Sequence, residues 1–313
     1  MEQALSKMLL LLIVALAVDS AAAQTKKMCI TIDDLPAVAY GKNDADHRWH
    51  ITHSIVNTLE QFDARAIGYV NESKLYNGGR FDSVAYQMLE YWLSHGQDLG
   101  NHTYAHPNYH KVGLEAFSAD ILKGEQHTKA LCARYGKELK YFRHPYLRSG
   151  ANRETSDALL VFLAEHGYEE APVTIDNDDY LFAVAYHRAF VRGDEKLMDS
   201  IGTSFIDYME AKLIHFEKLS SALFDREIDQ TLLLHANLLN AHWLDELLTR
   251  YASHGYTFVS QEEILRDPAY QTQVTKFGDW GISWLDRWAL SRNQGKELFS
   301  SDPRVPAFIG TIK

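Results

Sequence analysis

The chain lacks three features that would direct it to particular partners or architectures. It has no excess of basic residues: 31 Lys and Arg stand against 42 Asp and Glu, and the net charge of −11 argues against nucleic acid as a partner. Beyond the N-terminal region it has no long apolar run, so we expect no stable membrane insertion. It has only seven prolines and no low-complexity stretch that would act as a linker between separate units.

Cysteine is also scarce, because the 313 residues include only Cys29 and Cys132. Export from the cytoplasm would allow a disulfide between them. However, Cys29 lies in an apolar, strand-like run and Cys132 on an apparent helix face, where buried free thiols are common. We therefore expect two free, buried thiols in a globular protein whose apolar fraction is 46%.

The N-terminus has the pattern of a signal peptide. Lys7 precedes an apolar run at 8–18, and Ala21-Ala22-Ala23 follows as a small-residue cleavage site. The alternative is an uncleaved anchor, but the run is too short to span a bilayer comfortably. We expect 1–23 to be removed and the mature protein to be exported, to the periplasm or outside the cell.

The rest of the chain repeats one junction. Segments with helical periodicity end at His95-Gly96, His166-Gly167 and His254-Gly255, and a strand-like run follows each. A histidine in the last helical turn suits the helix dipole, and the glycine after it can take the left-handed conformation. We therefore interpret these histidines as caps, and the repeated junctions predict βα units around a mostly parallel sheet or barrel.

Ionisable residues follow five of the predicted strands. In parallel α/β folds the carboxyl ends of the strands form the active-site face, so five such residues in register predict an enzyme. The strands and the residues after them are 27–32 with Asp33 and Asp34, 97–100 with His102, 139–142 with Arg143, 171–175 with Asp176, and 231–234 with His235.

His102 and His106 are four positions apart, a spacing that puts two side chains on one face of a helical turn. Two neutral imidazoles on one face can hold a divalent metal such as zinc. With fifteen histidines in the chain, the spacing also arises by chance. A metal site therefore needs support from a third ligand.

Five short motifs, in order over roughly 28–266, resemble the polysaccharide deacetylase family, also called the NodB-homology or carbohydrate esterase family 4 fold. Each motif alone is weak, but the ordered set is specific. Residues 31–36 (TIDDLP) resemble the family's TFDDG with Leu35 in place of Gly, and 102–106 (HTYAH) match H[ST]xxH. Residues 143–146 (RHPY) resemble RxPY, 176–180 (DNDDY) fit DxxD with a following aromatic, and 232–235 (LLLH) fit LxH.

The resemblance implies a metal centre. Asp34, His102 and His106 would bind a divalent ion, which we expect to be zinc, and would leave positions open for water and substrate. Asp33 would be the general base. Arg143 would orient Asp33 by a charge-assisted hydrogen bond. Without the family pattern, the two aspartates would be interpreted as a turn or a helix N-cap and Arg143 as a surface ion pair.

The resemblance also implies the rest of the site. His235 would be the general acid, with Asp179 raising its pKa, whereas a histidine after an apolar strand is otherwise usually a core residue. The backbone N–H of Tyr146 would help to hold the oxyanion. Leu233 would line the acetyl pocket, and Tyr180 and Pro145 would be further substrate contacts. His144 departs from the family motif, and we interpret it as a pocket wall residue.

The predicted fold is α/β, a distorted (β/α) barrel of the NodB-homology type over 24–275. A helical insertion at about 182–229 precedes the last motif strand, and a C-terminal extension, 276–313, packs on the barrel. In the extension, Trp280, Trp284 and Trp288 are spaced at i, i+4 and i+8. A sugar-stacking stripe is one interpretation, but we favour burial against the barrel.

The expected function is metal-dependent removal of acetyl groups from N-acetylated or O-acetylated glycans. One alternative is a related esterase or amidase acting on a non-glycan substrate. Another is a catalytically inactive carbohydrate-binding homologue, which is disfavoured because every assigned catalytic position holds a competent side chain.

The signal peptide gives a first test. A reporter fused behind residues 1–24 should be cleaved near Ala23 and found outside the cytoplasm, because the apolar run and the small-residue site direct export. N-terminal sequencing of the exported reporter checks the cleavage site. A mature protein that still begins at Met1 would contradict this prediction.

Overall fold

The computed structural model describes residues 26–294 and 299–312. The predicted signal peptide, 1–23, lies outside the described residues. Among the helices that the structure describes, none combines the length and apolar character needed to cross a bilayer.

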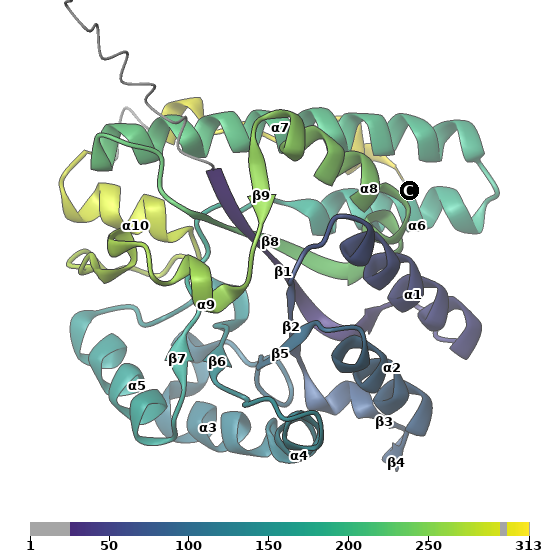
Figure 1. Cartoon of the computed structure of the whole chain (residues 1–313), viewed down its shortest axis with the longest axis horizontal. Helices are drawn as coiled ribbons and strands as arrows, with labels where there is room; N and C mark the ends of the chain where they lie inside the picture. Colours follow the sequence, from purple (N-terminus) through teal and green to yellow (C-terminus); the bar gives the residue numbers. More distant parts are fainter. Residues whose placement is uncertain (1–25, 295–298, 313) are drawn as a thin grey trace, which may run out of the picture.

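A curled parallel sheet forms the centre of the molecule (Figure 1). Its strand order is β7-β6-β5-β2-β1-β8, and β9 pairs with the start of β1. The long central strand β1 is buried between its neighbours, as its apolar residues require. The strands are β1 (Lys26–Val38), β2 (Ile67–Val70), β5 (Asp98–Asn101), β6 (Tyr141–Phe142), β7 (Glu169–Glu170), β8 (Gln230–Asn237) and β9 (Tyr256–Phe258); β3 (Tyr76–Asn77) and β4 (Arg80–Phe81) form a separate hairpin.

The sheet closes on itself through the segment after β7. Ile175 forms a single parallel bridge to Leu232 of β8, and the Leu233 N–H donates to the Ile175 carbonyl at 3.2 Å. The predicted distorted barrel is therefore confirmed. The predicted strand at 171–175 is wrong within the described chain, where it is reduced to this bridge, because Pro172 has no N–H to continue a ladder.

Helices surround the barrel, and three of them end at the predicted caps. His95, His166 and His254 are the C-cap residues, and the glycine after each has a positive φ of 78–87°. These predictions are confirmed. The helices are α1 (Ala45–Gln61), α2 (Ser83–Ser94), α3 (Tyr109–Lys123), α4 (Gln126–Arg134), α5 (Arg153–Glu165), α8 (Leu238–Ser253) and α9 (Gln261–Ile264).

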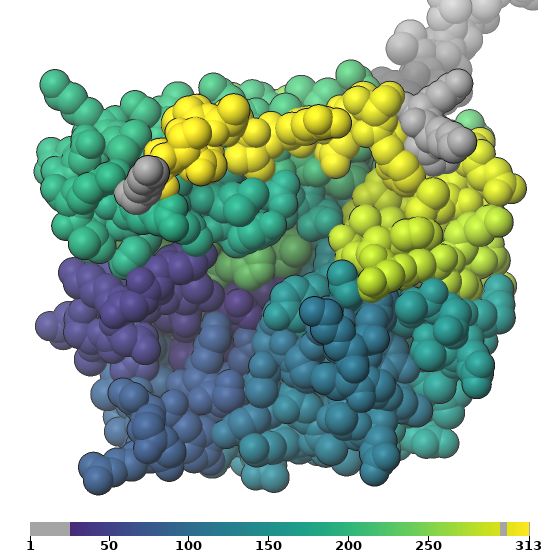
Figure 2. Space-filling model, turned by 180° about the vertical axis from the view of Figure 1, so that it is seen from behind, coloured from purple at the N-terminus to yellow at the C-terminus, as the bar shows by residue number. Residues whose placement is uncertain are grey.

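The predicted insertion is helical. It consists of α6 (Asp179–Val191) and the 30-residue α7 (Glu195–Phe224), which lie beside α8 along one side of the barrel (Figure 1). The C-terminal extension contains α10 (Trp284–Ser291) and then crosses this helical layer (Figure 2). Lys212 of α7 holds it by an ion pair of 2.6 Å to Asp302.

Two further interpretations are confirmed in the described residues. Cys29 and Cys132 are free and buried, and burial raises the pKa of both thiols. Trp284 and Trp288 are 3% and 0% exposed, so the tryptophan stripe is core at these two positions. Trp280 is half-buried and precedes the helix.

The buried stripe predicts a stability difference. Trp288→Ala should lower the free energy of unfolding by about 3–5 kcal/mol, because it leaves a large cavity in the core. It also removes the hydrogen bond from Nε1 to the Thr272 carbonyl, 2.9 Å. Trp280→Ala, the control, should cost much less. Urea unfolding measures the free energy of unfolding of both variants. Equally small losses in the two variants would contradict the interpretation of Trp288 as a core residue.

Candidate active site

A break in β1 places the two adjacent aspartates. Asp33 pairs in register with His235 of β8, after which the pairing with β8 is irregular up to Val38, and Asp34 has a left-handed φ of +69°. In a regular strand, neighbouring side chains point to opposite faces. The left-handed residue breaks this alternation, so both carboxylates line one pocket. The prediction that the strand ends at these residues is wrong, because β1 continues beyond them.

A turn, and not a helix, brings His102 and His106 together. Thr103 and His106 both have positive φ values, 68° and 56°, and the His106 N–H donates to Thr103 Oγ1 at 3.0 Å. Pro107 disfavours the helical conformation of the residue before it. The expectation that a helical turn brings the two histidines together is therefore wrong. The centroids of their imidazole rings nevertheless lie 4.8 Å apart.

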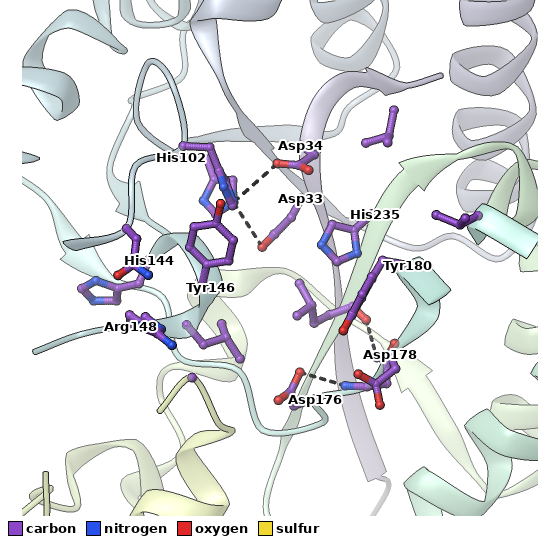
Figure 3. A pocket seen from close by; sticks show the side chains of 18 of the residues that line it. Asp33, Asp34, His102, His144, Tyr146, Arg148, Asp176, Asp178, Tyr180 and His235 are labelled. Atoms are coloured by element: carbon purple, nitrogen blue, oxygen red, sulfur yellow. Dashed lines mark hydrogen bonds and ion pairs between the residues drawn. The ribbon is translucent and has the colours of Figure 1, made fainter. Parts of the chain in front are cut away.

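These histidines lie with Asp34 in a group that could hold a metal ion, because one ligand atom of each residue lies within 4.8 Å of the others. Asp34 Oδ1 lies 3.7 Å from His102 Nε2 and 3.8 Å from His106 Nε2. His102 Nδ1 donates to the Arg143 carbonyl at 2.8 Å, which leaves the lone pair of Nε2 facing the carboxylate. Asp34 Oδ1 is buried and has no hydrogen-bond partner in the described structure, as expected of an atom that binds a cation. Figure 3 shows His102 facing both aspartates.

The protonation states of this set suit a divalent metal. Burial lowers the pKa of His102 and of His106, which keeps both imidazoles neutral. Burial alone would raise the pKa of Asp34, but the positive charges of Lys74 and His235 outweigh it and hold the pKa below its usual range. One ionised carboxylate and two neutral imidazoles are a donor set that fits zinc.

The pKa of Asp33 is shifted in the opposite direction to that of Asp34. Asp33 is 3% exposed, and burial raises its pKa to about 6 despite the charges of Arg143 and His235. The nearest Arg143 nitrogen, Nη1, is 4.0 Å from Asp33 Oδ2, too long for the direct hydrogen bond that the resemblance implies. Arg143 instead donates from Nη2 to Thr31 Oγ1 at 3.1 Å and stacks on Tyr69, so it acts on Asp33 through its charge.

His235 is held by a buried carboxylate. Its Nδ1 donates to Asp179 Oδ1 at 2.6 Å, and its N–H donates to Asp179 Oδ2 at 3.0 Å. Asn240 Nδ2 donates to the same Oδ2 at 2.8 Å. Burial would lower the pKa of His235, but the charge of Asp179 outweighs it and raises the pKa to about 9. The imidazole is therefore protonated at neutral pH, and it faces the pocket between Asp33 and Tyr180 (Figure 3).

The pocket around these groups has a volume of about 780 Å³. Tyr146 and Tyr180 are 56% and 46% exposed at its rim, and Leu233 is buried at its floor. His144 lines the wall, as interpreted, and contacts Glu170 Oε1 at 2.8 Å. Pro145 is buried and does not line the pocket, because the left-handed turn that follows it brings later residues there. Asp176 also lines it, and burial raises its pKa to about 7.

Sequence reasoning missed Lys74. This residue lies in a short 3₁₀ helix, η1 (Glu72–Leu75), and its Nζ donates to the Asp34 carbonyl at 2.7 Å. The same Nζ lies 3.8 Å from Asp34 Oδ2. Lys74 lies shortly after β2 and outside every motif, so no sequence pattern indicated its role. Four further residues also lie outside every motif: Asn240, which contacts Asp179, and the pocket-lining Tyr40, Lys111 and Arg148.

With this geometry in place, comparison with known proteins gives a family match. A family model described as polysaccharide deacetylase matches residues 20–170, which is 151 of the 313 residues and just under half of the chain. Over this region the chain is similar to the polysaccharide deacetylases, a family of hydrolases. The matched region contains Asp33, Asp34 and both histidines of the turn, whereas His235 lies beyond it.

Several solved structures are similar to this chain at low sequence identity. A family 4 carbohydrate esterase from Bacillus anthracis is 17% identical, with a TM-score of 0.47, over 77% of this chain and 83% of that one. A family 4 carbohydrate esterase from Streptomyces lividans in complex with acetate is 18% identical, with a TM-score of 0.46, over 76% and 95%. A family 4 pseudoenzyme from Bacillus anthracis is 17% identical, with a TM-score of 0.45, over 77% and 66%. No curated protein matches the chain.

The His235–Asp179 pair predicts a measurable titration. In the wild type, His235 should stay protonated at neutral pH and lose its proton as the pH rises through about 9. Asp179→Asn should lower this pKa to below its ordinary value, because the burial remains while the negative charge is gone. NMR titration of the imidazole signals measures both values.

The control is Asp178→Asn, because Asp178 contacts the Tyr208 hydroxyl and not His235. It should leave the His235 titration near the wild-type value. An unchanged pKa in Asp179→Asn would show that the ion pair does not set the protonation state.

Proposed function

We propose that this protein is an exported, metal-dependent deacetylase that removes acetyl groups from glycans. The observation that carries the proposal is one pocket with three kinds of group. A carboxylate and two imidazoles form a ligand set, a second buried carboxylate lies beside it, and a protonated histidine lies on the other side.

Asp34, His102 and His106 would hold the metal, which we propose is zinc, since a carboxylate with two imidazoles is a common catalytic zinc set. A divalent ion bound there would supply Lewis acidity, which polarises an acetyl carbonyl and lowers the pKa of water. Lys74 would fix the backbone of Asp34 by its hydrogen bond to the Asp34 carbonyl.

Asp33 would take the proton from the attacking water. Its pKa of about 6 leaves it ionised at neutral pH while making it a stronger base than an ordinary aspartate. His235 would donate its proton to the leaving amine or alkoxide, and Asp179 would keep it charged and oriented. The Tyr146 backbone N–H would stabilise the oxyanion, and Leu233 would contact the acetyl methyl group.

The pocket rim supports a glycan as the substrate. The exposed rings of Tyr146 and Tyr180 lie on opposite sides of the opening (Figure 3), where they can pack against the faces of sugar rings. We assign no substrate contact to Pro145, because it is buried away from the lining.

Replacement of the two aspartates tests the division of roles. Asp34→Ala should lose metal and acetate release together. Asp33→Asn should keep one metal per chain but lose activity by about 10²- to 10⁴-fold, because an amide cannot take the proton from water. Metal analysis and acetate release from a panel of acetylated glycans measure both properties on the same samples. Metal loss in Asp33→Asn with retention in Asp34→Ala would reverse the assignment.

Replacement of the distant histidine tests the general acid. His235→Ala should keep the metal, and its defect should shrink on substrates with good leaving groups, which need no proton on departure. Rates on an acetylated amino sugar and on an activated acetyl ester give the comparison. Full activity of His235→Ala on the amide would make His235 a structural residue and would contradict the proposed mechanism.

A further inference from the structure

The loop that carries Tyr146 has a conformation that its own bonds do not explain. Tyr146 and Leu147 are consecutive non-glycine residues with left-handed φ values of 58° and 51°. Such a conformation persists only where the surroundings hold it. Within the loop, the Leu147 and Arg148 N–H groups donate to the carbonyls of His144 and Pro145. His144 also contacts Glu170, and the Tyr146 ring packs on His106. Several further contacts to this loop, 144–150, come from the C-terminal extension.

Arg287 of α10 makes the first contact. Its guanidinium is fully buried, stacks on the Trp284 ring and donates from Nη2 to the Leu147 carbonyl at 2.6 Å. Its Nε and Nη1 have no hydrogen-bond partner among the described residues. Burying a charge with so few partners is costly. The arginine is therefore better explained by what it holds in place than by a gain in stability.

Gly281 makes the second contact. Its backbone packs so closely on the loop that an added Cβ would lie 1.8 Å from the Tyr146 carbonyl oxygen. Gly281 also lines the pocket, so the C-terminal extension reaches the site itself. Any side chain at this position forces the extension and the Tyr146 carbonyl apart.

Asp279 makes the third contact, at the rim. Its Oδ1 accepts hydrogen bonds from Arg148 Nη1 at 2.7 Å and from His110 Nδ1 at 3.0 Å. His110 Nε2 in turn accepts the Gly150 N–H at 3.0 Å. One carboxylate thus ties the end of the loop to α3 through His110, although its own exposure limits the energy of the ion pair.

The extension is itself fixed on the barrel beside the start of the loop. The backbone N–H of Trp284 donates to the Val173 carbonyl at 2.7 Å. The Trp284 ring stacks on the His144 ring, with 6.1 Å between their centroids. The contacts therefore bracket the loop from its first residue to its last.

We propose that residues 279–288 of the C-terminal extension form a clamp that positions the Tyr146 backbone for the reaction. The proposal rests on the proposed deacetylase function, in which the Tyr146 N–H meets the negative charge that develops on the acetyl oxygen. Arg287, Gly281 and Asp279 touch neither metal ligands nor substrate atoms in this scheme. They are positioning residues, and the extension is part of the active site.

Gly281→Ala tests the clamp. Its kcat should fall by about 10- to 100-fold, the range expected when a donor to the oxyanion is displaced, while KM changes little. Metal content should stay at one per chain, because β1 and the turn after β5 carry the ligands. Hydrogen exchange of peptides covering 144–150 should become faster. Gly310→Ala is the matched control in the same extension, since no described atom lies within 4 Å of its added Cβ.

Asp279→Asn is the second variant, chosen because its exposed side chain can be changed without endangering the fold. It should lower kcat by about threefold and speed exchange of the loop slightly. Wild-type kcat and wild-type loop exchange in Gly281→Ala would overturn the clamp, and so would a fall in kcat that comes only with loss of metal. If the wild type releases no acetate, the proposed function fails, and loop exchange alone still decides whether the clamp exists.

Discussion

The site depends on one irregularity in the central strand. β1 pairs with β2, β8 and β9, so its register fixes the positions of its neighbours. Asp33 still belongs to this ladder and lies opposite His235, whereas Asp34 leaves it through a left-handed turn. A regular strand would have sent one of the two carboxylates to the other face of the sheet. The irregularity places both in one pocket, opposite a histidine from the adjacent strand.

Burial and charge then give the neighbouring carboxylates different properties. Both are desolvated, which by itself raises a carboxyl pKa. For Asp34 the nearby charges, Lys74 above all, outweigh this effect, whereas for Asp33 they do not. Across the pocket, Asp179 outweighs the burial of His235 in the same manner. The residues that we propose as ligand, base and acid therefore have different pKa values because their buried partners differ.

The helices added to the barrel complete this arrangement. Asp179, from the motif at 176–180, is the first residue of α6, so the helix that leads into the insertion begins with the partner of His235. The C-terminal extension contacts the opposite wall through Gly281 and Arg287. The barrel supplies the reactive groups, and the added helices hold the walls that face them.

The sequence alone determined the barrel class, the helix caps and the two buried thiols, because these depend on local periodicity and on which residues fit a helix end. Its motifs also named Asp34, His102 and His106, which the structure brings together. Only the tertiary structure decided that the two histidines meet through a turn and that Arg143 lies 4.0 Å from Asp33. It also decided that Lys74 contacts the Asp34 carbonyl and Arg287 the Leu147 carbonyl. Such contacts join residues far apart in the chain. The sequence next to a residue does not show which distant side chain it will contact.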